Sequence, residues 1–218
     1  QIGLGFLNFE NANGHLPQGP YDGDPKAVTT SGAPDPAASD YSKYNPCCNA
    51  ASPNGWNQFF KILPYMEQQT LYNIANFTAP AIHTGRPADM NGEQTVSRVA
   101  VPTFYCPTRR VNERYGSNPA TATSRNDYAG CAGFYRDTPD DGMGGVNRGN
   151  TPGRRGAVVW AGQGAKRLLA EFRDGTSNSI LAAEKCLPPT RYGSDGGDNE
   201  MWENSGWDED SIRFHSPP

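Results

Sequence analysis

Glycine and proline interrupt this sequence so often that few segments are long enough to form a helix of several turns. The chain holds 25 glycines and 19 prolines among its 218 residues. Glycine favours turns, and proline lacks the backbone N–H that helices and sheets need. Residues 18–55 are especially rich in proline and are predicted to form one long loop. Ten tyrosines, nine phenylalanines and four tryptophans still predict a modest apolar core under such loops.

Apolar residues recur at helical spacing in the first segment, residues 1–13. Ile2, Phe6 and Phe9 fall on one face of a helix, and two leucines widen the stripe. A glycine and a proline follow shortly after residue 13 and are expected to end the helix. Because the pattern is already present at Gln1, we expect this segment to be the end of a longer helix.

A second helical pattern covers residues 56–77. Its apolar face contains Trp56, Phe59, Phe60, Leu63, Met66, Leu71 and Ile74. Pro64 lies in the middle of this pattern, where a proline removes one backbone hydrogen bond. We therefore expect a kinked helix or two consecutive helices.

Further along the chain the apolar pattern shortens to the spacing of strands. A short helix is predicted at residues 93–99, and short strands at 103–106, 128–134, 157–160 and 179–185. Residues 168–172 fit either a strand or a helical turn. Because helices precede strands instead of alternating with them, the sequence predicts an α+β fold.

Charge and hydropathy bear on the class of partner. Charged residues make up 19% of the chain, and the formal net charge is −4. No basic cluster exceeds the pairs Arg109–Arg110 and Arg154–Arg155, so we expect no nucleic-acid partner. No apolar run approaches the roughly 20 residues that span a bilayer as a helix.

The five cysteines, Cys47, Cys48, Cys106, Cys131 and Cys186, fit no zinc-binding spacing. In a chain so rich in loops they predict extracytoplasmic disulfides, with Cys106–Cys131 as the preferred pair. An odd number leaves at least one thiol free or paired between chains. The alternative is that the cysteines are small, buried apolar residues.

Five segments carry a resemblance to a known family. They are QIGLGFLNFENANGHLPQG (1–19), LPYMEQQTLYN (63–73), VPTFYCPT (101–108), NDYAG (126–130) and DGTSNSILAAE (174–184). In this order they resemble a very large bacterial family of prepilin-type proteins of unknown function, which is also filed under a solute-binding heading. The first segment is similar to the stretch that follows the hydrophobic helix in that family.

The resemblance implies a single pilin-like domain over residues 1–218. Such a domain has an N-terminal helix packed on an antiparallel sheet with long Gly/Pro-rich loop insertions, and residues 100–218 would be its β-rich part. Members of the family, like type IV pilins and secretion pseudopilins, begin with a leader, a processing site and a hydrophobic helix. They usually close with a further pair of strands, before which this chain stops. Only the missing hydrophobic helix would contact the membrane, and the domain would lie outside the cell or on its surface.

The C-terminal part of the sequence contains the candidate metal ligands. Tentative calcium ligands are Asp195, Asp198, Glu200, Asp208 and Asp210, which are interleaved with glycines. Calcium takes about 6–8 oxygen ligands, and some secretion pseudopilins similarly hold calcium near their C-terminus. The spacing does not follow the EF-hand order, so a solvated acidic surface is the favoured alternative.

No catalytic motif accompanies the three histidines, so we expect no enzyme activity. The oxygen-rich segment 174–178 could contact a ligand or cation, but the favoured interpretation is a structural turn that leads into the strand at 179–185. Glu184 is expected to be buried and paired.

Two hypotheses for the function remain. The first is a structural subunit, similar to a pseudopilin, that self-associates into a surface filament or a secretion-related assembly through head-to-tail contacts. The alternative is an extracytoplasmic module that binds a carbohydrate or another solute. In that case exposed Trp160, Trp202 and Trp207 would be stacking platforms for a glycan, although core packing is the simpler role of a tryptophan.

Overall fold

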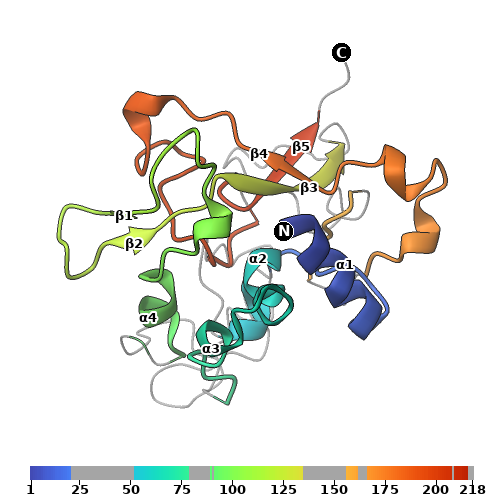
Figure 1. Cartoon of the computed structure of the whole chain (residues 1–218), viewed down its shortest axis with the longest axis horizontal. Coiled ribbons are helices and arrows are strands. Elements are labelled where there is room, and N and C mark those ends of the chain that lie inside the picture. The colour runs from blue at the N-terminus through green and yellow to red at the C-terminus, as the bar shows by residue number, and fades with distance from the viewer. Residues whose placement is uncertain are drawn as a thin grey trace, which may run out of the picture.

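The computed structural model describes residues 1–20, 52–78, 89, 91–134, 156–161, 166–207 and 209–215. The predictions for most of the loop 18–55 and for Cys47, Cys48, Asp208 and Arg154–Arg155 fall outside these residues. The described part is a mixed α and β structure with short helices and two small sheets, which confirms the α+β class (Figure 1). None of its helices is long and apolar enough to cross a membrane.

The predicted N-terminal helix is confirmed as α1, Ile2–Asn13. Gly14 ends it in the left-handed conformation with φ of 74°, and its N–H donates to the carbonyl of Glu10. Glycine adopts the left-handed conformation at a lower cost than any residue with a side chain. The glycine that was expected to end the helix therefore does so for a physical reason. Phe6 is fully buried and packs edge-on against Phe59 with ring centroids 6.3 Å apart.

The second helical pattern forms several short helices instead of the expected kinked or paired helix. They are α2 (Gln58–Lys61), the 3₁₀ helix η2 (Leu63–Met66) and α3 (Gln69–Tyr72), and the 3₁₀ turn η1 (Pro53–Gly55) lies just before the pattern. Pro64 lies in the first turn of η2, and Glu67 then adopts φ of 60° and ends it. The apolar spacing persists through these breaks, because Phe59, Phe60 and Leu63 are all fully buried.

The next two elements give one confirmed prediction and one error. The short helix is confirmed as α4, Glu93–Ser97. The strand predicted at 103–106 is wrong, because this segment is mostly the 3₁₀ turn η3, Pro102–Phe104. Pro102 occupies the first turn of η3, where its fixed φ suits a helical turn and its missing N–H costs nothing.

Two sheets follow. The hairpin β1 (Arg114–Tyr115) and β2 (Thr123–Ser124) forms the first sheet. The second has the order β4–β3–β5, with β3 at Tyr128–Phe134, β4 at Ala182–Glu184 and β5 at Ile212–His215. β4 is antiparallel to β3 and β5 is parallel to it, so this sheet is mixed and not antiparallel as expected.

Several strand predictions can now be judged. Residues 128–134 are confirmed, whereas the strand predicted at 179–185 shrinks to Ala182–Glu184. Residues 157–160 are not a strand, although the Val158 N–H does donate to the Cys131 carbonyl. The ambiguous segment 168–172 contains a helical turn. Further 3₁₀ turns in the described residues are η7 (Leu169–Glu171), η8 (Thr176–Asn178) and η9 (Pro189–Arg191).

The predicted Cys106–Cys131 disulfide is wrong, because both thiols are free, as is Cys186. The backbone N–H of Cys106 donates to the Asp127 carboxylate at 2.8 Å, just before β3 begins. Cys131 lies further along this extended strand, which rises about 3.3 Å per residue. Cys106 is therefore held beside the start of β3, whereas Cys131 lies four residues beyond Asp127 along the chain.

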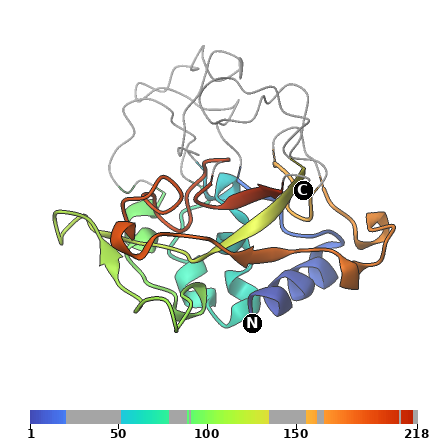
Figure 2. The same cartoon turned by 90° about the horizontal axis from the view of Figure 1, so that it is seen from above.

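An aromatic core fills the space between the helices and the three-stranded sheet. Its largest buried members are Phe6, Trp56, Phe59, Phe60, Phe104, Trp202 and Trp207. Figure 1 shows the helices along one side of this sheet and the β1–β2 hairpin projecting beyond its end, and in Figure 2 β4 lies between α1 and β3. Among the described residues, β4 is an edge strand of this sheet.

Candidate functional site

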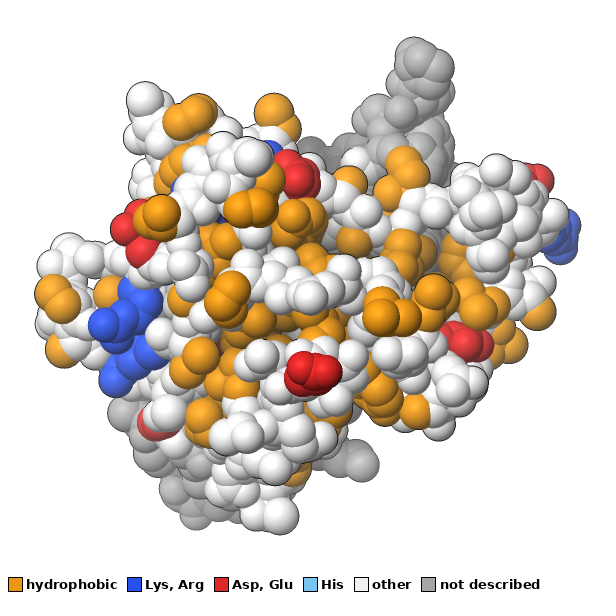
Figure 3. Space-filling view, viewed as in Figure 1, with side chains coloured by type: hydrophobic (Ala, Val, Ile, Leu, Met, Phe, Trp, Pro, Cys, Tyr) orange, Lys and Arg blue, Asp and Glu red, His pale blue; other side chains and the backbone are white. Residues whose placement is uncertain are grey.

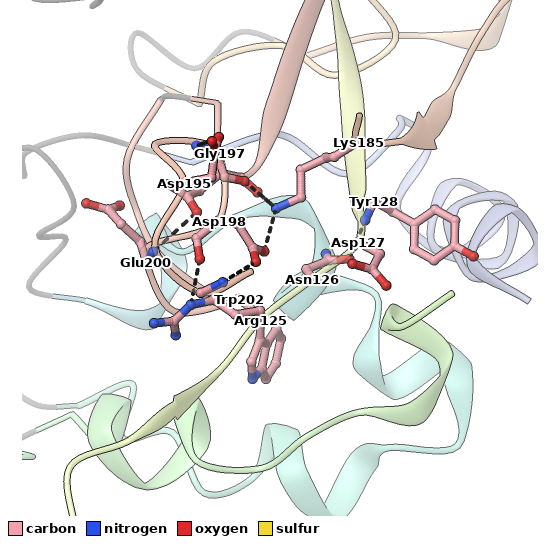
Figure 4. A network of polar contacts seen from close by, with 12 residues as sticks. Arg125, Asn126, Asp127, Tyr128, Lys185, Asp195, Gly197, Asp198, Glu200 and Trp202 are labelled. Atoms are coloured by element: carbon pink, nitrogen blue, oxygen red, sulfur yellow. Dashed lines mark hydrogen bonds and ion pairs between the residues drawn. The ribbon is translucent and has the colours of Figure 1, made fainter. Parts of the chain in front are cut away.

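The carboxylate of Asp198, in the loop between β4 and β5, is fully buried and surrounded by hydrogen-bond donors. Both terminal nitrogens of Arg110 contact it, at 2.5 and 2.8 Å. The ammonium of Lys185 lies 3.4 Å away, and the backbone N–H of Gly193 donates to it at 2.8 Å (Figure 4 shows Asp198 beside Lys185). Each oxygen of this carboxylate therefore accepts at least two donors.

A second buried carboxylate, Asp127, extends the network to the sheet. Arg110 contacts it at 2.7 Å, and the Cys106 N–H donates to it at 2.8 Å. The neighbouring Arg109 is 3.7 Å from Asp127 and 3.3 Å from Glu184 on β4. The pairing predicted for Glu184 is confirmed, but its side chain is about half exposed and not buried.

Arg125 adds a third buried cation. Its Nε donates to the Asp198 carbonyl at 2.8 Å, and its Nη1 donates to the carbonyls of Thr123 and Ser124. We call Arg110, Arg125, Asp127, Lys185 and Asp198 the ionic clamp. It ties the β1–β2 hairpin and β3 to the C-terminal loop that follows β4.

Three tyrosine rings enclose the guanidinium of Arg110. The rings of Tyr105, Tyr115 and Tyr192 have their centroids 5.3, 5.1 and 4.9 Å from the guanidinium carbon. Cation–π contacts of this kind contribute about 0.5–2 kcal/mol each, and more when they are desolvated. Burial raises the pKa of Tyr115 to about 12, so this ring stays uncharged at neutral pH.

The electrostatics of the clamp favour a structural role. Burial by itself would raise the pKa of Asp198, but the hydrogen bonds from Arg110 and the charge of Lys185 hold it below its usual value. Burial likewise lowers the pKa of Arg110, but its hydrogen bond to Asp198 and the charges of Asp198 and Asp127 raise it overall. A carboxylate and a guanidinium fixed in their charged forms neither donate nor accept a proton near neutral pH. The arrangement suits holding segments together, not acid–base catalysis.

The predicted calcium ligands that the structure describes make contacts within the protein. Asp198 faces cations in the clamp, and Asp195 pairs with Arg191 at 3.4 Å. Asp210 accepts the backbone N–H of Glu200 at 3.2 Å. Among the residues that the structure describes, no group of three or more His, Cys, Asp or Glu side chains is placed to hold a metal ion. The calcium site stays a prediction, because Asp208 lies outside those residues.

Glu203 is a buried carboxyl group that the sequence did not single out. Its side chain is fully buried, and neither of its oxygens has a hydrogen-bond partner in the described structure. Burial raises the pKa of Glu203 to about 8, so it is largely protonated at neutral pH. In the sequence it is one of several acidic residues between positions 195 and 210, with no signal that separates it from the others.

The tryptophans expected at the surface are inside the protein. Trp160, Trp202 and Trp207 are 6%, 3% and 4% exposed, so the prediction of exposed stacking platforms is wrong. The physical reason is their packing: Trp202 lies against Phe104, and Trp207 lies edge-on to Phe214.

The oxygen-rich segment 174–178 forms a turn, as the favoured interpretation expected. Gly175 has φ of 87°, and the Asn178 amide donates to the Asp174 carbonyl at 2.7 Å. The 3₁₀ turn η8 begins directly after Gly175, within this segment, and the chain then continues toward β4. Some of the polar groups of segment 174–178 thus form hydrogen bonds within the turn itself.

Large apolar side chains are exposed on α1 and on the chain that packs beside it. Leu4 is 62% exposed, Leu7 48%, Ile180 65% and Leu168 44%. We call these four residues the α1 face. In Figure 3 hydrophobic side chains gather across the middle of the side that carries α1 and β4. Exposed large apolar side chains commonly mark an interaction site when they gather on one side of a protein.

A groove of about 570 Å³ lies beside the α1 face, which we call the β4 groove. Its lining residues are Gln1, Ile2, Gly3, Pro102, Thr103, Tyr105, Pro107, Tyr128, Leu181 and Ala182. None of them carries a charged side chain at neutral pH. A second, smaller cavity of about 60 Å³ shares Leu181 with the groove and reaches Leu7, so the groove and the α1 face are neighbours.

The chain matches one family over residues 1–216, the family described as protein of unknown function, DUF1559. The chain belongs to this family. No curated protein and no solved structure matches it. The family description carries no activity, so any function must be argued from the geometry.

The segments that carried the resemblance meet in the folded protein. Every residue that lines the β4 groove lies in one of four of them, 1–19, 101–108, 126–130 and 174–184. The sequence supplied these segments but not their contact, because they are far apart along the chain. The groove is therefore the feature of this DUF1559 protein that sequence reasoning missed, and the shared motif segments were the available signal.

Proposed function

We propose that this protein is a structural, extracytoplasmic subunit that associates with copies of itself in a pilin-like filament or secretion-related assembly. The observation that carries the proposal is the α1 face. A short amphipathic helix buries Phe6 in the core while Leu4 and Leu7 remain exposed on it. Ile180 is also exposed, on the segment that leads into β4.

The α1 face is costly for a protein that stays monomeric in water. Burying a leucine or isoleucine side chain gains roughly 1.5–3 kcal/mol relative to leaving it exposed. Two copies that cover these side chains recover part of that free energy on association, less the cost of lost translational and rotational freedom. Contacts between different surfaces of successive copies would propagate into a helical fibre, and contacts between like surfaces would close into a dimer.

The pilin-like assignment rests on the resemblance of residues 1–19 and on the mixed α and β structure with α1 at its N-terminal end. In this proposal α1 continues a hydrophobic helix that anchors the subunit in the membrane before assembly. The domain itself then lies at the cell surface or outside the cell. The ionic clamp and the aromatic core would give it the rigidity that a repeating subunit needs.

Electron microscopy of the native protein tests the proposal. The expected result is regular filaments, with α1 at the contact between neighbouring subunits. Dispersed single particles at all concentrations, with no regular contact through α1, would contradict it.

A second candidate is a solute-binding module, and the β4 groove favours it. Its volume lies within the roughly 300–1,000 Å³ of small-molecule sites. The described tryptophans are not available for stacking on a sugar, since they are buried. A glycan array and a calorimetric panel of small solutes test this candidate, and binding abolished by filling the groove at Ala182 would support it.

A further inference from the structure

Only every second residue of β4 directs its backbone N–H and C=O at β3. The Cys131 N–H donates to the Leu181 carbonyl at 3.0 Å, and the Lys185 N–H donates to the Asp127 carbonyl at 2.7 Å. Because antiparallel pairing alternates along a strand, Leu181, Ala183 and Lys185 direct their backbone groups at β3. Ala182, which lies between the first two, directs its N–H and C=O to the opposite side.

The opposite side of β4 is the open edge of the sheet. Within the described residues, the strand order β4–β3–β5 leaves β4 with β3 as its one neighbour. Glu184 has the same parity as Ala182, so both residues present an N–H and a C=O there. No hydrogen bond of these outward backbone groups occurs within the described part of the chain. Such a row of donors and acceptors is a template for a further strand.

The β4 groove runs beside this edge. Ala182 and Leu181 line it from the strand, and Ile2 and Gly3 line it from the first turn of α1. Tyr128 pairs with Glu184 across the ladder, so its ring lies on the same face of the sheet as the Ala182 side chain. The edge and the groove therefore offer backbone pairing and a place for side chains in one site.

We propose that the open edge of β4 binds an extended, uncharged peptide segment as an additional strand, with alternate side chains of the segment entering the β4 groove. This mode takes its affinity from main-chain hydrogen bonds and its specificity from pockets for every second side chain. It goes beyond self-association through the α1 face and does not require it.

The chemistry of the groove selects the partner. Its lining is apolar apart from amide and hydroxyl groups, and no charged side chain there would compensate a buried charge on the ligand. A charged peptide would lose hydration without gaining a partner. The nearby Glu184 already pairs with Arg109, which also lies 3.7 Å from Asp127. An uncharged segment with β-branched residues at alternate positions matches both the edge and the lining.

Amide hydrogen exchange on the complete chain tests the proposal. The probe is the uncharged peptide acetyl-Thr-Val-Thr-Val-Thr-Val-amide, and the control is the same peptide N-methylated at every residue. At saturation the first peptide should slow exchange of the Ala182 and Glu184 amides at least tenfold. The N-methylated peptide should change these rates less than twofold. Unchanged rates with the first peptide, or equal slowing by both peptides, would overturn the proposal.

Two matched variants locate the site. Ala182→Arg fills the groove with a long side chain, whereas Ala183→Arg places the same side chain on the opposite face of the strand, where Ala183 is exposed. The first variant should raise the dissociation constant of the peptide at least tenfold, and the second no more than twofold. Equal effects would show that the peptide binds elsewhere. Either outcome leaves self-association to be judged by its own variants at Leu4 and Leu7.

Discussion

The aromatic core between the helices and the sheet and the ionic clamp behind the β1–β2 hairpin are both buried, but different forces hold them. The core is assembled from edge-to-face and stacked rings, such as Phe59 on Phe104 at 5.5 Å. The clamp is assembled from charges, with Arg110 between two buried carboxylates. Regular secondary structure is sparse in both regions, so side chains and not ladders of backbone hydrogen bonds define much of the fold.

The difference teaches where the protein tolerates change. Apolar packing is non-directional and accepts side chains of similar volume at a cost below about 1.5 kcal/mol. A buried charge that loses its partner costs about 3–5 kcal/mol, because the remaining charge cannot return to water. Conservative substitutions should therefore be mild in the core and severe in the clamp.

The largest effect is expected for Arg110→Ala. This substitution leaves Asp198 and Asp127 buried with fewer donors and empties the space between three tyrosine rings. We expect the free energy of unfolding to fall by about 3–5 kcal/mol in urea denaturation. Arg114→Ala on the exposed part of β1 is the control and should change it by less than about 0.5 kcal/mol. Equal effects of the two variants would break the comparison.

The next effect is a pH dependence that originates at Glu203. The folded-state pKa of Glu203 is raised to about 8 by burial, above its ordinary value near 4.5. Its contribution to stability is thus complete below about pH 4.5 and is lost as the pH rises through 8. Glu203→Gln keeps the shape and removes the titration, so at pH 9 it should be more stable than the native protein by a few kcal/mol.

The native protein and Glu203→Gln should differ little in stability at pH 4.5. Thermal unfolding across pH 4.5–9 measures how their stabilities diverge as the pH rises. Exposed Glu67→Gln is the control and should follow the native protein. Burial lowers the pKa of Lys61 to about 7, so the contribution of Lys61 to stability increases with pH above neutral pH. Because Lys61 is present in both proteins, this contribution cancels in the comparison. Parallel curves for the native protein and Glu203→Gln would show that Glu203 is not buried as a neutral acid.

The smallest effect is expected in the aromatic core. Leu63→Met conserves volume at a fully buried position of η2. The free energy of unfolding should fall by less than about 1.5 kcal/mol. A loss as large as that of Arg110→Ala would mean that a volume-conserving change in the core costs as much as removing the central cation of the clamp, and the contrast between the two regions would fail.

Short-range sequence patterns correctly predicted the helix and the strand that depend on neighbouring residues alone. The apolar stripe and Gly14 predicted α1, and the apolar run over 128–134 predicted β3. The strand expected at 103–106 failed because Pro102 starts a helical turn there, an effect that strand propensity did not outweigh. The kinked helix expected around Pro64 became separate short helices because Glu67 adopts a left-handed conformation.

The site could not be predicted in the same way, because its parts are distant in sequence. Arg110, Lys185 and Asp198 each resemble ordinary surface residues until the fold brings them together in the interior. Trp202 and Trp207 lie among acidic residues, which suggested exposure, yet both are buried. The motif segments pointed to the right regions, but only the fold shows that four of them enclose one groove.

Sedimentation velocity of three proteins over a range of concentrations tests the central claim most directly. They are the native chain, Leu4→Lys with Leu7→Lys, and Val111→Lys, in which the replaced side chain is 70% exposed and follows Arg110 of the ionic clamp in the sequence. The account predicts concentration-dependent association of the native chain and of Val111→Lys, and monomers for the double variant. Association of all three to the same extent, or of none, would contradict a self-associating α1 face.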